Sequence, residues 1–205
     1  MDIKLNFINQ SNDANNSEVV IFQKNAATNL GELAVAWLVI RNCGQGDNHP
    51  FVYPMSMAVG ASDSFGNYTP HLPALSGQKF AMTLTKSGDQ LSFVGEARSP
   101  QEVEVENRLS TGAIDAMIYK AGSVFAKKTG IAPGQLAAFQ FKPTLWIGVV
   151  SQVEQGQVMN EAIMSSIDTE FSLFGIASAD IVMTGGGSGP EAKPFEFHLE
   201  NVMMA

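Results

Sequence analysis

Cysteine is nearly absent from this sequence, because Cys43 is the single cysteine among 205 residues. An intrachain disulfide therefore cannot form, and a cage of several thiolates around a metal ion is excluded. Free cysteine is among the most buried residue types, so we expect Cys43 to act as a small core side chain. Its neighbours Arg41, Asn42 and Gly44 include no base that would activate a thiolate nucleophile.

Positive charge is also scarce. Twelve Lys and Arg residues stand against twenty Asp and Glu residues, which leaves a formal net charge of −8. A phosphate backbone would be repelled by such a chain, so nucleic acid is not an expected partner. The imbalance lies in residues 143–205, which contain eight acidic residues and only Lys193 as a base.

Long apolar runs are missing as well. No stretch approaches the ~20 consecutive apolar residues of a membrane-spanning helix. The opening residues 1–7 lack the apolar core of a secretory signal. We therefore expect no transmembrane helix and cytoplasmic synthesis without a signal peptide, with leaderless export or release by lysis as the routes out of the cell.

Local catalytic and cofactor motifs are absent from the sequence. The glycine-rich run Thr184–Gly189 continues into Pro190, where a phosphate-binding loop needs Gly-Lys-Ser/Thr at the start of a helix. His49, His71 and His198 lie in separate segments without the spacing of a local metal site. We therefore predict no catalytic residue, no cofactor and no metal, and a hydrolase with a composite site is only the third functional hypothesis.

What the sequence does contain is an apolar period of two. Ile3, Leu5 and Phe7 alternate with polar residues, and the same rhythm returns at residues 80–85, 102–106 and 195–199. Such alternation is typical of strands with one buried face. Residues 19–22, 33–40 and 145–150 are apolar throughout, which indicates strands covered on both faces.

Turn residues separate these runs at short intervals. Ser87-Gly88-Asp89 and the segment 120–123 predict tight connections between neighbouring strands. Helical spacing is confined to one candidate, Gln157 to Ser165. About fourteen short strands and no evident linker predict an all-β fold, an antiparallel two-sheet sandwich of jelly-roll or Greek-key type with little helix, formed as a single domain over residues 1–205.

Two groups of conspicuous residues have ordinary structural interpretations. Glu102, Glu104 and Glu106 share one face of a strand, and we interpret them as a solvated sheet edge, since charge on an edge discourages aggregation. Trp37 and Trp146 lie within strongly apolar strands, so core packing is expected for both.

Loops rich in Gly and Pro carry the candidate ligand-binding residues. Aromatic and polar side chains in such loops are suited to contact a sugar ring or a cell surface. The candidates are Asp47, His49, Tyr53, Phe65, Asn67 and Tyr68. They favour a non-enzymatic, lectin-like binding or assembly protein that recognises a carbohydrate or a cell surface, and exposed strand edges are compatible with a homo-oligomer.

The segment 163–183 supports a second hypothesis, a membrane-active, β-pore-forming protein of toxin type. Apolar side chains recur at odd positions, an amphipathic pattern that pore-forming hairpins share. The apolar positions are Ile163, Ile167, Phe171, Leu173, Ile181 and Met183. Phe174 and Ile176 interrupt the alternation, which favours an ordinary pair of sandwich strands around Gly175.

Overall fold

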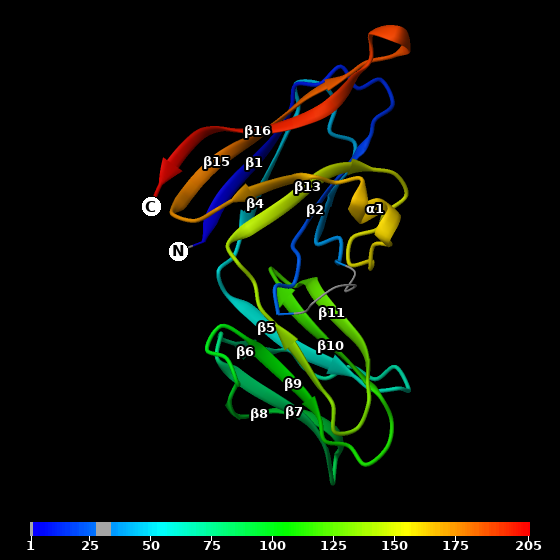
Figure 1. Ribbon diagram of the computed structural model, residues 1–205, viewed down its shortest axis with the longest axis vertical. Helices are drawn as coiled ribbons and strands as arrows, with labels where there is room; N and C mark the ends of the chain where they lie inside the picture. The colour runs from blue at the N-terminus through cyan, green and yellow to red at the C-terminus, as the bar shows by residue number, and fades with distance from the viewer. Residues whose placement is uncertain (1, 28–33) are drawn as a thin grey trace. The chain divides into compact units, whose positions relative to one another are not determined.

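The computed structural model describes residues 2–27 and 34–205. In these residues sixteen β-strands account for nearly all regular structure, and two short helices account for the rest (Figure 1). The strands form four sheets of four strands each. The prediction of an all-β protein with little helix is confirmed. Neither helix in the described residues combines the length and the apolar character needed to cross a bilayer.

The chain divides into two compact units. Unit 1 comprises Met1–Phe22, Ala36–Met55 and Pro143–Ala205, and unit 2 comprises Gln23–Val35 and Ser56–Lys142. Each unit holds two of the four sheets. The single domain over residues 1–205 stays a prediction.

Unit 1 contains eight strands and both helices among the described residues. One sheet has the strand order β16-β15-β1-β4 and the other β14-β13-β2-β3. The elements are β1 (Ile3–Asn9), β2 (Glu18–Phe22), β3 (Leu38–Ile40), β4 (Asn48–Tyr53), β13 (Thr144–Val150), α1 (Glu161–Ser165), β14 (Thr169–Ser172), β15 (Ile176–Gly186), the 3-10 helix η1 (Gly189–Glu191) and β16 (Lys193–Met204).

The core of unit 1 follows the predicted alternation. Ile3, Leu5 and Phe7 of β1 are buried, while Lys4 between them is exposed. Trp37 is also buried, as predicted, and its ring packs edge-on against Tyr53 of β4 at 5.8 Å between centroids. This contact stabilises unit 1 because Trp37 lies next to β3, so the two rings join elements of its two sheets.

Trp146 differs from the core position that we predicted. It is only half-buried on β13, where its ring stacks against Phe22 of β2 at 6.3 Å between centroids. The strand is apolar throughout, but successive side chains still point to opposite faces of the sheet, and the Trp146 face is partly open to solvent.

Unit 2 contains the other eight strands. One sheet has the order β11-β10-β5-β6 and the other β12-β9-β7-β8. The elements are β5 (Met57–Ser62), β6 (Leu72–Ala74), β7 (Gln78–Thr85), β8 (Gly88–Glu96), β9 (Val103–Asn107), β10 (Ile114–Lys120), β11 (Ser123–Ile131) and β12 (Leu136–Phe139). The two predicted turns join β7 to β8 and β10 to β11.

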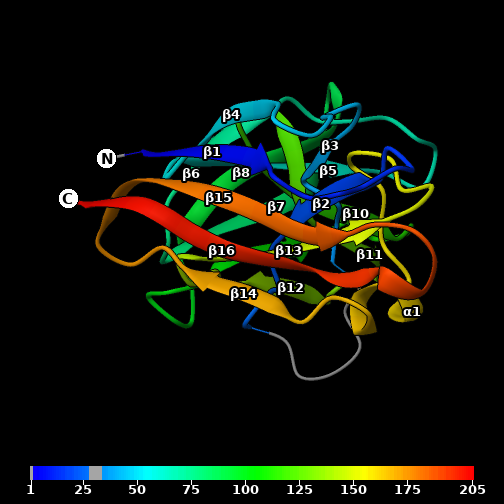
Figure 2. The same cartoon turned by 90° about the horizontal axis from the view of Figure 1, so that it is seen from above.

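Strand direction departs from the prediction of purely antiparallel sheets. β1 pairs parallel with β15, with Phe7 opposite Ile181, and β7 pairs parallel with β9. Figure 2 shows β1, β15 and β16 running side by side. An alternating pattern reports which face of a strand is buried and carries no information about direction, so the sequence could not reveal these parallel pairs.

Two of the three glutamates of the predicted edge, Glu104 and Glu106, lie on an interior strand of a sheet, and the half-buried Glu102 immediately precedes that strand. β9 runs between β12 and β7, and Glu104 is 1% exposed, with Oε1 accepting a hydrogen bond from the backbone N–H of Arg98 at 3.1 Å. Glu106 pairs with Lys79 at 3.0 Å and with Arg108 at 2.8 Å. The edge interpretation was wrong because cations from the neighbouring strand and from the end of β9 compensate the Glu106 charge.

Three further boundaries differ from the expected ones. The helix is shorter than the candidate segment, because α1 begins after Asn160, whose side chain caps it by accepting the N–H of Ile163 at 2.9 Å. The predicted strand 33–40 is reduced to β3, and Leu33 lies outside the described residues. The two strands around Gly175 do not pair, because β14 joins β13 while β15 joins β1 and β16.

Candidate functional site

A hairpin loop of unit 2, residues 63–69, is organised by one carboxylate. Asp63 Oδ1 accepts the backbone N–H groups of Phe65 at 2.9 Å and Asn67 at 2.8 Å, and Oδ2 accepts the Asn67 side-chain amide at 2.7 Å. Gly66 has a positive φ of 85°, which glycine adopts without steric cost. The loop is therefore held in one conformation by its own side chains.

The hydrogen bonds within the loop determine the protonation of Asp63. The side-chain amide and the backbone of Asn67 favour the charged carboxylate and lower the pKa of Asp63 below its ordinary value, against a small opposing effect of desolvation. Asp63 is therefore a negative group at neutral pH, and its two oxygens are largely engaged in positioning the loop.

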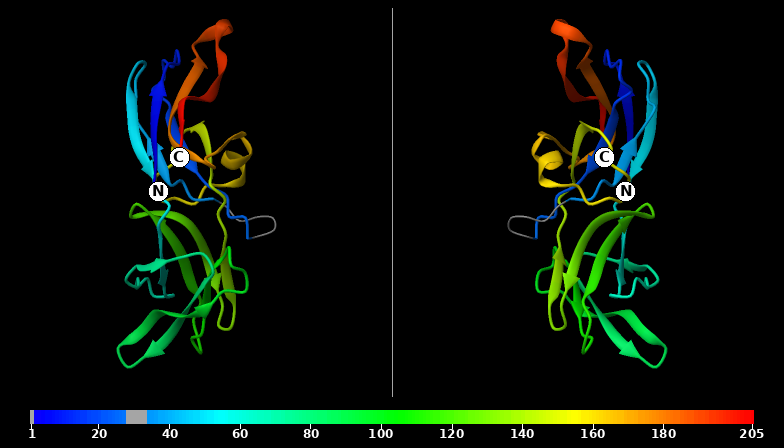
Figure 3. Two further views of the ribbon diagram at one scale, coloured as in Figure 1. Left: turned by 90° about the vertical axis from the view of Figure 1, so that its left-hand side faces the viewer. Right: turned by 90° about the vertical axis from the view of Figure 1, so that its right-hand side faces the viewer.

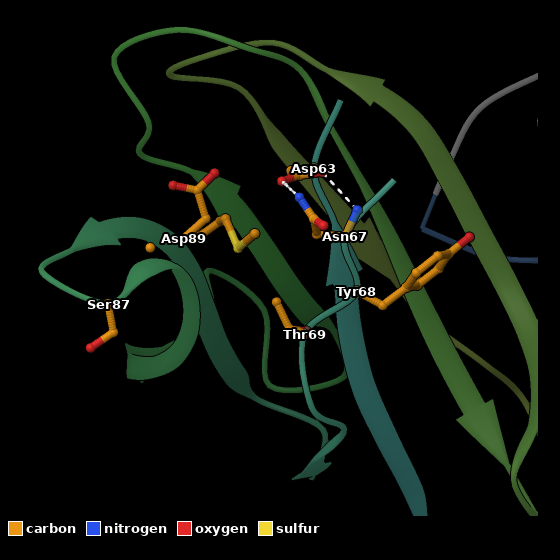
Figure 4. A pocket seen from close by; sticks show the side chains of 8 residues that line it. Asp63, Asn67, Tyr68, Thr69, Ser87 and Asp89 are labelled. Atoms are coloured by element: carbon orange, nitrogen blue, oxygen red, sulfur yellow. Dashed lines mark hydrogen bonds between the residues drawn. The ribbon is translucent and has the colours of Figure 1, made fainter. Parts of the chain in front are cut away.

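A pocket of about 370 Å³ opens beside the loop. Its lining comes from the 63–69 loop, from β7 and from the β7–β8 turn, and consists of Asp63, Asn67, Tyr68, Thr69, Met82, Ser87, Gly88 and Asp89. Figure 4 shows the Asp89 carboxylate on the hairpin side and the Asp63–Asn67 pair across from it. Carboxylate, amide and hydroxyl groups thus surround a small cavity that suits a ligand with several hydroxyl groups.

Asp89 is the unengaged acceptor of this pocket. In the described part of the chain its carboxylate has no hydrogen-bond or salt-bridge partner, whereas the Asp63 carboxylate accepts three hydrogen bonds from the loop. Its position follows from the Ser87-Gly88-Asp89 turn, in which Gly88 has a φ of 107°. An ionised carboxylate can accept hydrogen bonds from two neighbouring hydroxyl groups of one ligand.

Tyr68 borders the pocket on its other side. Its ring points away from Asp89 in Figure 4 and is 66% exposed. Nearby, the exposed ring of His71 stacks on the Tyr119 ring at 3.7 Å between centroids. Burial, followed by the proximity of Tyr68, raises the pKa of Tyr119. Aromatic surface therefore continues outward from the polar pocket.

The structure brings part of the predicted site together. Asn67 and Tyr68 line the pocket, and Phe65 lies at the tip of the same loop with 88% of its surface exposed. Asp47 and His49 belong to unit 1, where they line a different pocket. Tyr53, expected in a loop, lies in β4 and is 2% exposed, because its ring fills the core beside Trp37.

The unit 1 pocket has a volume of about 340 Å³ and a polar lining. It is bordered by Arg41, Asn42, Cys43, Gly46, Asp47, Asn48 and His49. Cys43 is only half-buried and borders this pocket, so its expected position in the core was wrong. Partial burial, and secondarily the Asp47 charge, raises the pKa of the Cys43 thiol. The thiol is therefore protonated at neutral pH, which makes it a poor nucleophile.

Sequence reasoning missed Asp63, Thr69, Ser87 and Asp89. Asp63 carried a usable signal, because an Asp followed by a Gly three residues later and an Asn after it is suited to a side-chain-capped turn. The sequence identifies Asp89 only as part of the Ser87-Gly88-Asp89 turn, not as a pocket residue. Its approach to the 63–69 loop depends on the strand order and the tertiary structure of unit 2, which no local pattern encodes.

Four of the six residues of the membrane-segment hypothesis lie on three elements of unit 1, α1, β14 and β15, and the other two, Ile167 and Leu173, lie in the connections between these elements. Ile167, Leu173, Ile181 and Met183 are buried in the core. Ile163 on α1 and Phe171 on β14 are half-buried, and Ile163 borders a surface pocket of about 470 Å³. Membrane insertion of this segment would require extracting the core residues, and the hypothesis stays a prediction.

Metal-ligating side chains do not gather anywhere in the described ranges, in that no three His, Cys, Asp or Glu residues form a group able to hold an ion. Comparison with known proteins found no family model, no curated protein and no solved structure that matches this chain.

Proposed function

We propose that the protein is a non-enzymatic binding or assembly protein that recognises carbohydrate, including that of a cell surface, through loops of a β-sandwich. The observation that carries the proposal is the 370 Å³ pocket, where the unengaged Asp89 carboxylate faces a pre-ordered loop beside the exposed Tyr68 ring. Sugars present hydroxyl groups and apolar ring faces together, which these groups complement.

The pocket and the aromatic surface address different parts of a ligand. One sugar ring is expected to occupy the polar pocket, with its hydroxyl groups donating to Asp89. Because Tyr68 points away from Asp89, a second sugar is expected to lie against its ring. The preferred ligand is therefore an oligosaccharide, and a loop already ordered by Asp63 reduces the entropic cost of binding it.

The sandwich type belongs to the same proposal. Two four-stranded sheets per unit, with neighbours as distant in sequence as β1 and β15, support a Greek-key or jelly-roll arrangement in which the buried faces of the two sheets pack together. X-ray crystallography tests this arrangement. Sheets whose apolar faces do not oppose each other within a unit would reject the sandwich.

A glycan array followed by titration calorimetry of any retained oligosaccharide tests the function. Tyr68→Ala and Asp89→Asn are each expected to weaken binding at least about tenfold, because a stacked ring and a charged acceptor are lost. Phe174→Ala is the matched control, since Phe174 is an aromatic residue of unit 1 that is 81% exposed. Absence of any retained glycan, or equal binding by all three variants, would reject carbohydrate recognition at this pocket.

A further inference from the structure

The last strand of unit 1 leaves one of its edges without a strand partner among the described residues. β16 is the outermost strand of the sheet β16-β15-β1-β4 and pairs only with β15 (Figures 1 and 3). It spans twelve residues, more than any other strand in the described structure. A long unpaired edge is a template for another strand.

The hydrogen bonds of β15 establish which residues of β16 face this open edge. The Met183 carbonyl accepts the N–H of Gln10 at 2.9 Å, so the backbone groups of Met183 face β1. Val182 and Thr184 alternate with it and bond to β16, opposite His198 and Glu196. The intervening residues of β16, Phe195, Phe197 and Leu199, therefore direct their N–H and C=O groups outward.

Side chains alternate along β16 in the same way. Phe195, Phe197 and Leu199 are half-buried on the inner face, and Glu196, His198 and Glu200 are exposed on the outer face. On the outer face, His198 Nε2 lies 2.9 Å from Glu200 Oε1 of the same chain. The inner apolar residues are incompletely covered because β16 is the last strand of its sheet.

This pattern is complementary to itself. When two β16 strands are placed antiparallel about a two-fold axis at Phe197, each Glu196 lies opposite His198 of the other strand. The same axis places Phe197 opposite Phe197 of the other strand, and Phe195 opposite Leu199 of the other strand. Glu196 and His198 then form a non-hydrogen-bonded pair, in which side chains approach most closely. A carboxylate accepts a hydrogen bond from an imidazole N–H in this geometry.

We propose that the protein forms a two-fold dimer through antiparallel pairing of β16 with β16 of a second copy, centred on Phe197. The outward N–H and C=O groups of Phe195, Phe197 and Leu199 are satisfied by the second strand, and two Glu196–His198 pairs flank the axis. The paired segment ends before Asn201, whose φ of 49° interrupts the regular strand. An isologous contact of this kind closes on itself and does not propagate into fibres.

Charge argues for a second copy over an unrelated strand. Natural edges are commonly blocked by inward-pointing charges, by lysine or by proline. In β16 such residues are limited to Lys193 and Pro194 at its beginning, outside the segment 195–199. Within that segment the two charged or titratable side chains, Glu196 and His198, oppose each other when the strand meets itself.

Sedimentation velocity of the full chain over about two decades of concentration tests the proposal. We expect a monomer–dimer equilibrium in the wild type. His198→Glu places two carboxylates opposite each other at both symmetric positions, so the dimer Kd is expected to rise at least about tenfold. The double variant E196H/H198E exchanges the two partners, preserves the pairing and is expected to restore the wild-type Kd.

Glu154→Lys is the control, because Glu154 is an exposed carboxylate of unit 1 that lies outside β16 and opposes no residue of the proposed pairing. It is expected to change the dimer Kd by less than about threefold, the effect of an exposed charge without a cross-strand partner. A wild type that sediments as a monomer throughout would overturn the proposal. A dimer weakened by Glu154→Lys, or one in which the exchanged pair fails to restore the Kd, would overturn the Phe197-centred interface.

Discussion

Asn107 joins three segments of unit 2 by hydrogen bonds in a fully buried position. Its side-chain amide donates to the carbonyls of Gly112 at 2.9 Å and Ile131 at 2.8 Å, and its Oδ1 accepts the N–H of Leu109 at 3.0 Å. The residue is 0% exposed. Asn107→Ala would remove all three bonds and leave their backbone partners without side-chain compensation.

The size of this effect follows from those three bonds. A buried polar group left without its partner costs about 1–3 kcal/mol. The buried Leu109 N–H and Ile131 carbonyl are two such groups, whereas Gly112 is exposed and water can replace its lost partner, so the expected loss in the free energy of unfolding is about 2–5 kcal/mol. Because whole domains are stable by only about 5–15 kcal/mol, this loss is expected to remove a large share of the stability of unit 2.

Urea unfolding followed by far-ultraviolet circular dichroism measures this loss. Tryptophan fluorescence is unsuitable, because Trp37 and Trp146 both belong to unit 1. Asn15→Ala is the control, since Asn15 is an exposed asparagine whose substitution is expected to change stability by no more than about 0.5 kcal/mol. A loss below about 1 kcal/mol for Asn107→Ala would refute the reasoning that the buried amide stabilises unit 2.

Three further predictions concern packing and protonation. Gly148→Ala would place a Cβ 2.6 Å from Ile167 Cγ1, so urea unfolding is expected to show a loss of about 1–3 kcal/mol in the free energy of unfolding. This loss is expected to be smaller in an Ile167→Ala background, which makes room for the added methyl group. Additive effects of the two substitutions would contradict the overpacking. Iodoacetamide is expected to alkylate Cys43 slowly at neutral pH, because burial and the Asp47 charge raise the thiol pKa. Alkylation is expected to be faster in Asp47→Asn, which removes that charge. An equal or slower rate in the variant would contradict the effect of Asp47 on the thiol. Carbon-detected NMR is expected to show Asp63 titrating below about 3.9, its ordinary value. Its stabilisation of the loop is fully present above that value and is lost as the pH falls through the lowered pKa, and a midpoint at or above 3.9 would contradict the hydrogen-bonded carboxylate.

Local features of the fold were predictable where one face of a strand is buried and the other is wet. The alternation in residues 3–7 placed β1, and the Ser87-Gly88-Asp89 turn placed the β7–β8 connection. Both depend on neighbouring residues alone. The interior position of Glu104 was not predictable, because an acidic strand normally indicates a solvated edge, and the neighbours β12 and β7 that enclose β9 come from other parts of the chain.

The candidate site was predictable to the same extent. Asn67, Tyr68 and Phe65 were identified because glycine and proline marked their segment as a loop, and loops expose aromatic side chains. Asp89 could not be assigned to the same pocket, because its distance from Asn67 is decided by the pairing of strands far apart in the chain. Tyr53 had the same loop-like surroundings in sequence, yet its ring packs against Trp37.

The sequence by itself determined that this protein is built of strands, where many of them turn, and that its surface is acidic, because side-chain period, turn chemistry and charge are local properties. Tertiary structure alone decided which strands are neighbours, which pairs are parallel, and which loop residues meet around a pocket. These outcomes depend on contacts between residues distant in the chain, and a strand's own pattern is compatible with many partners.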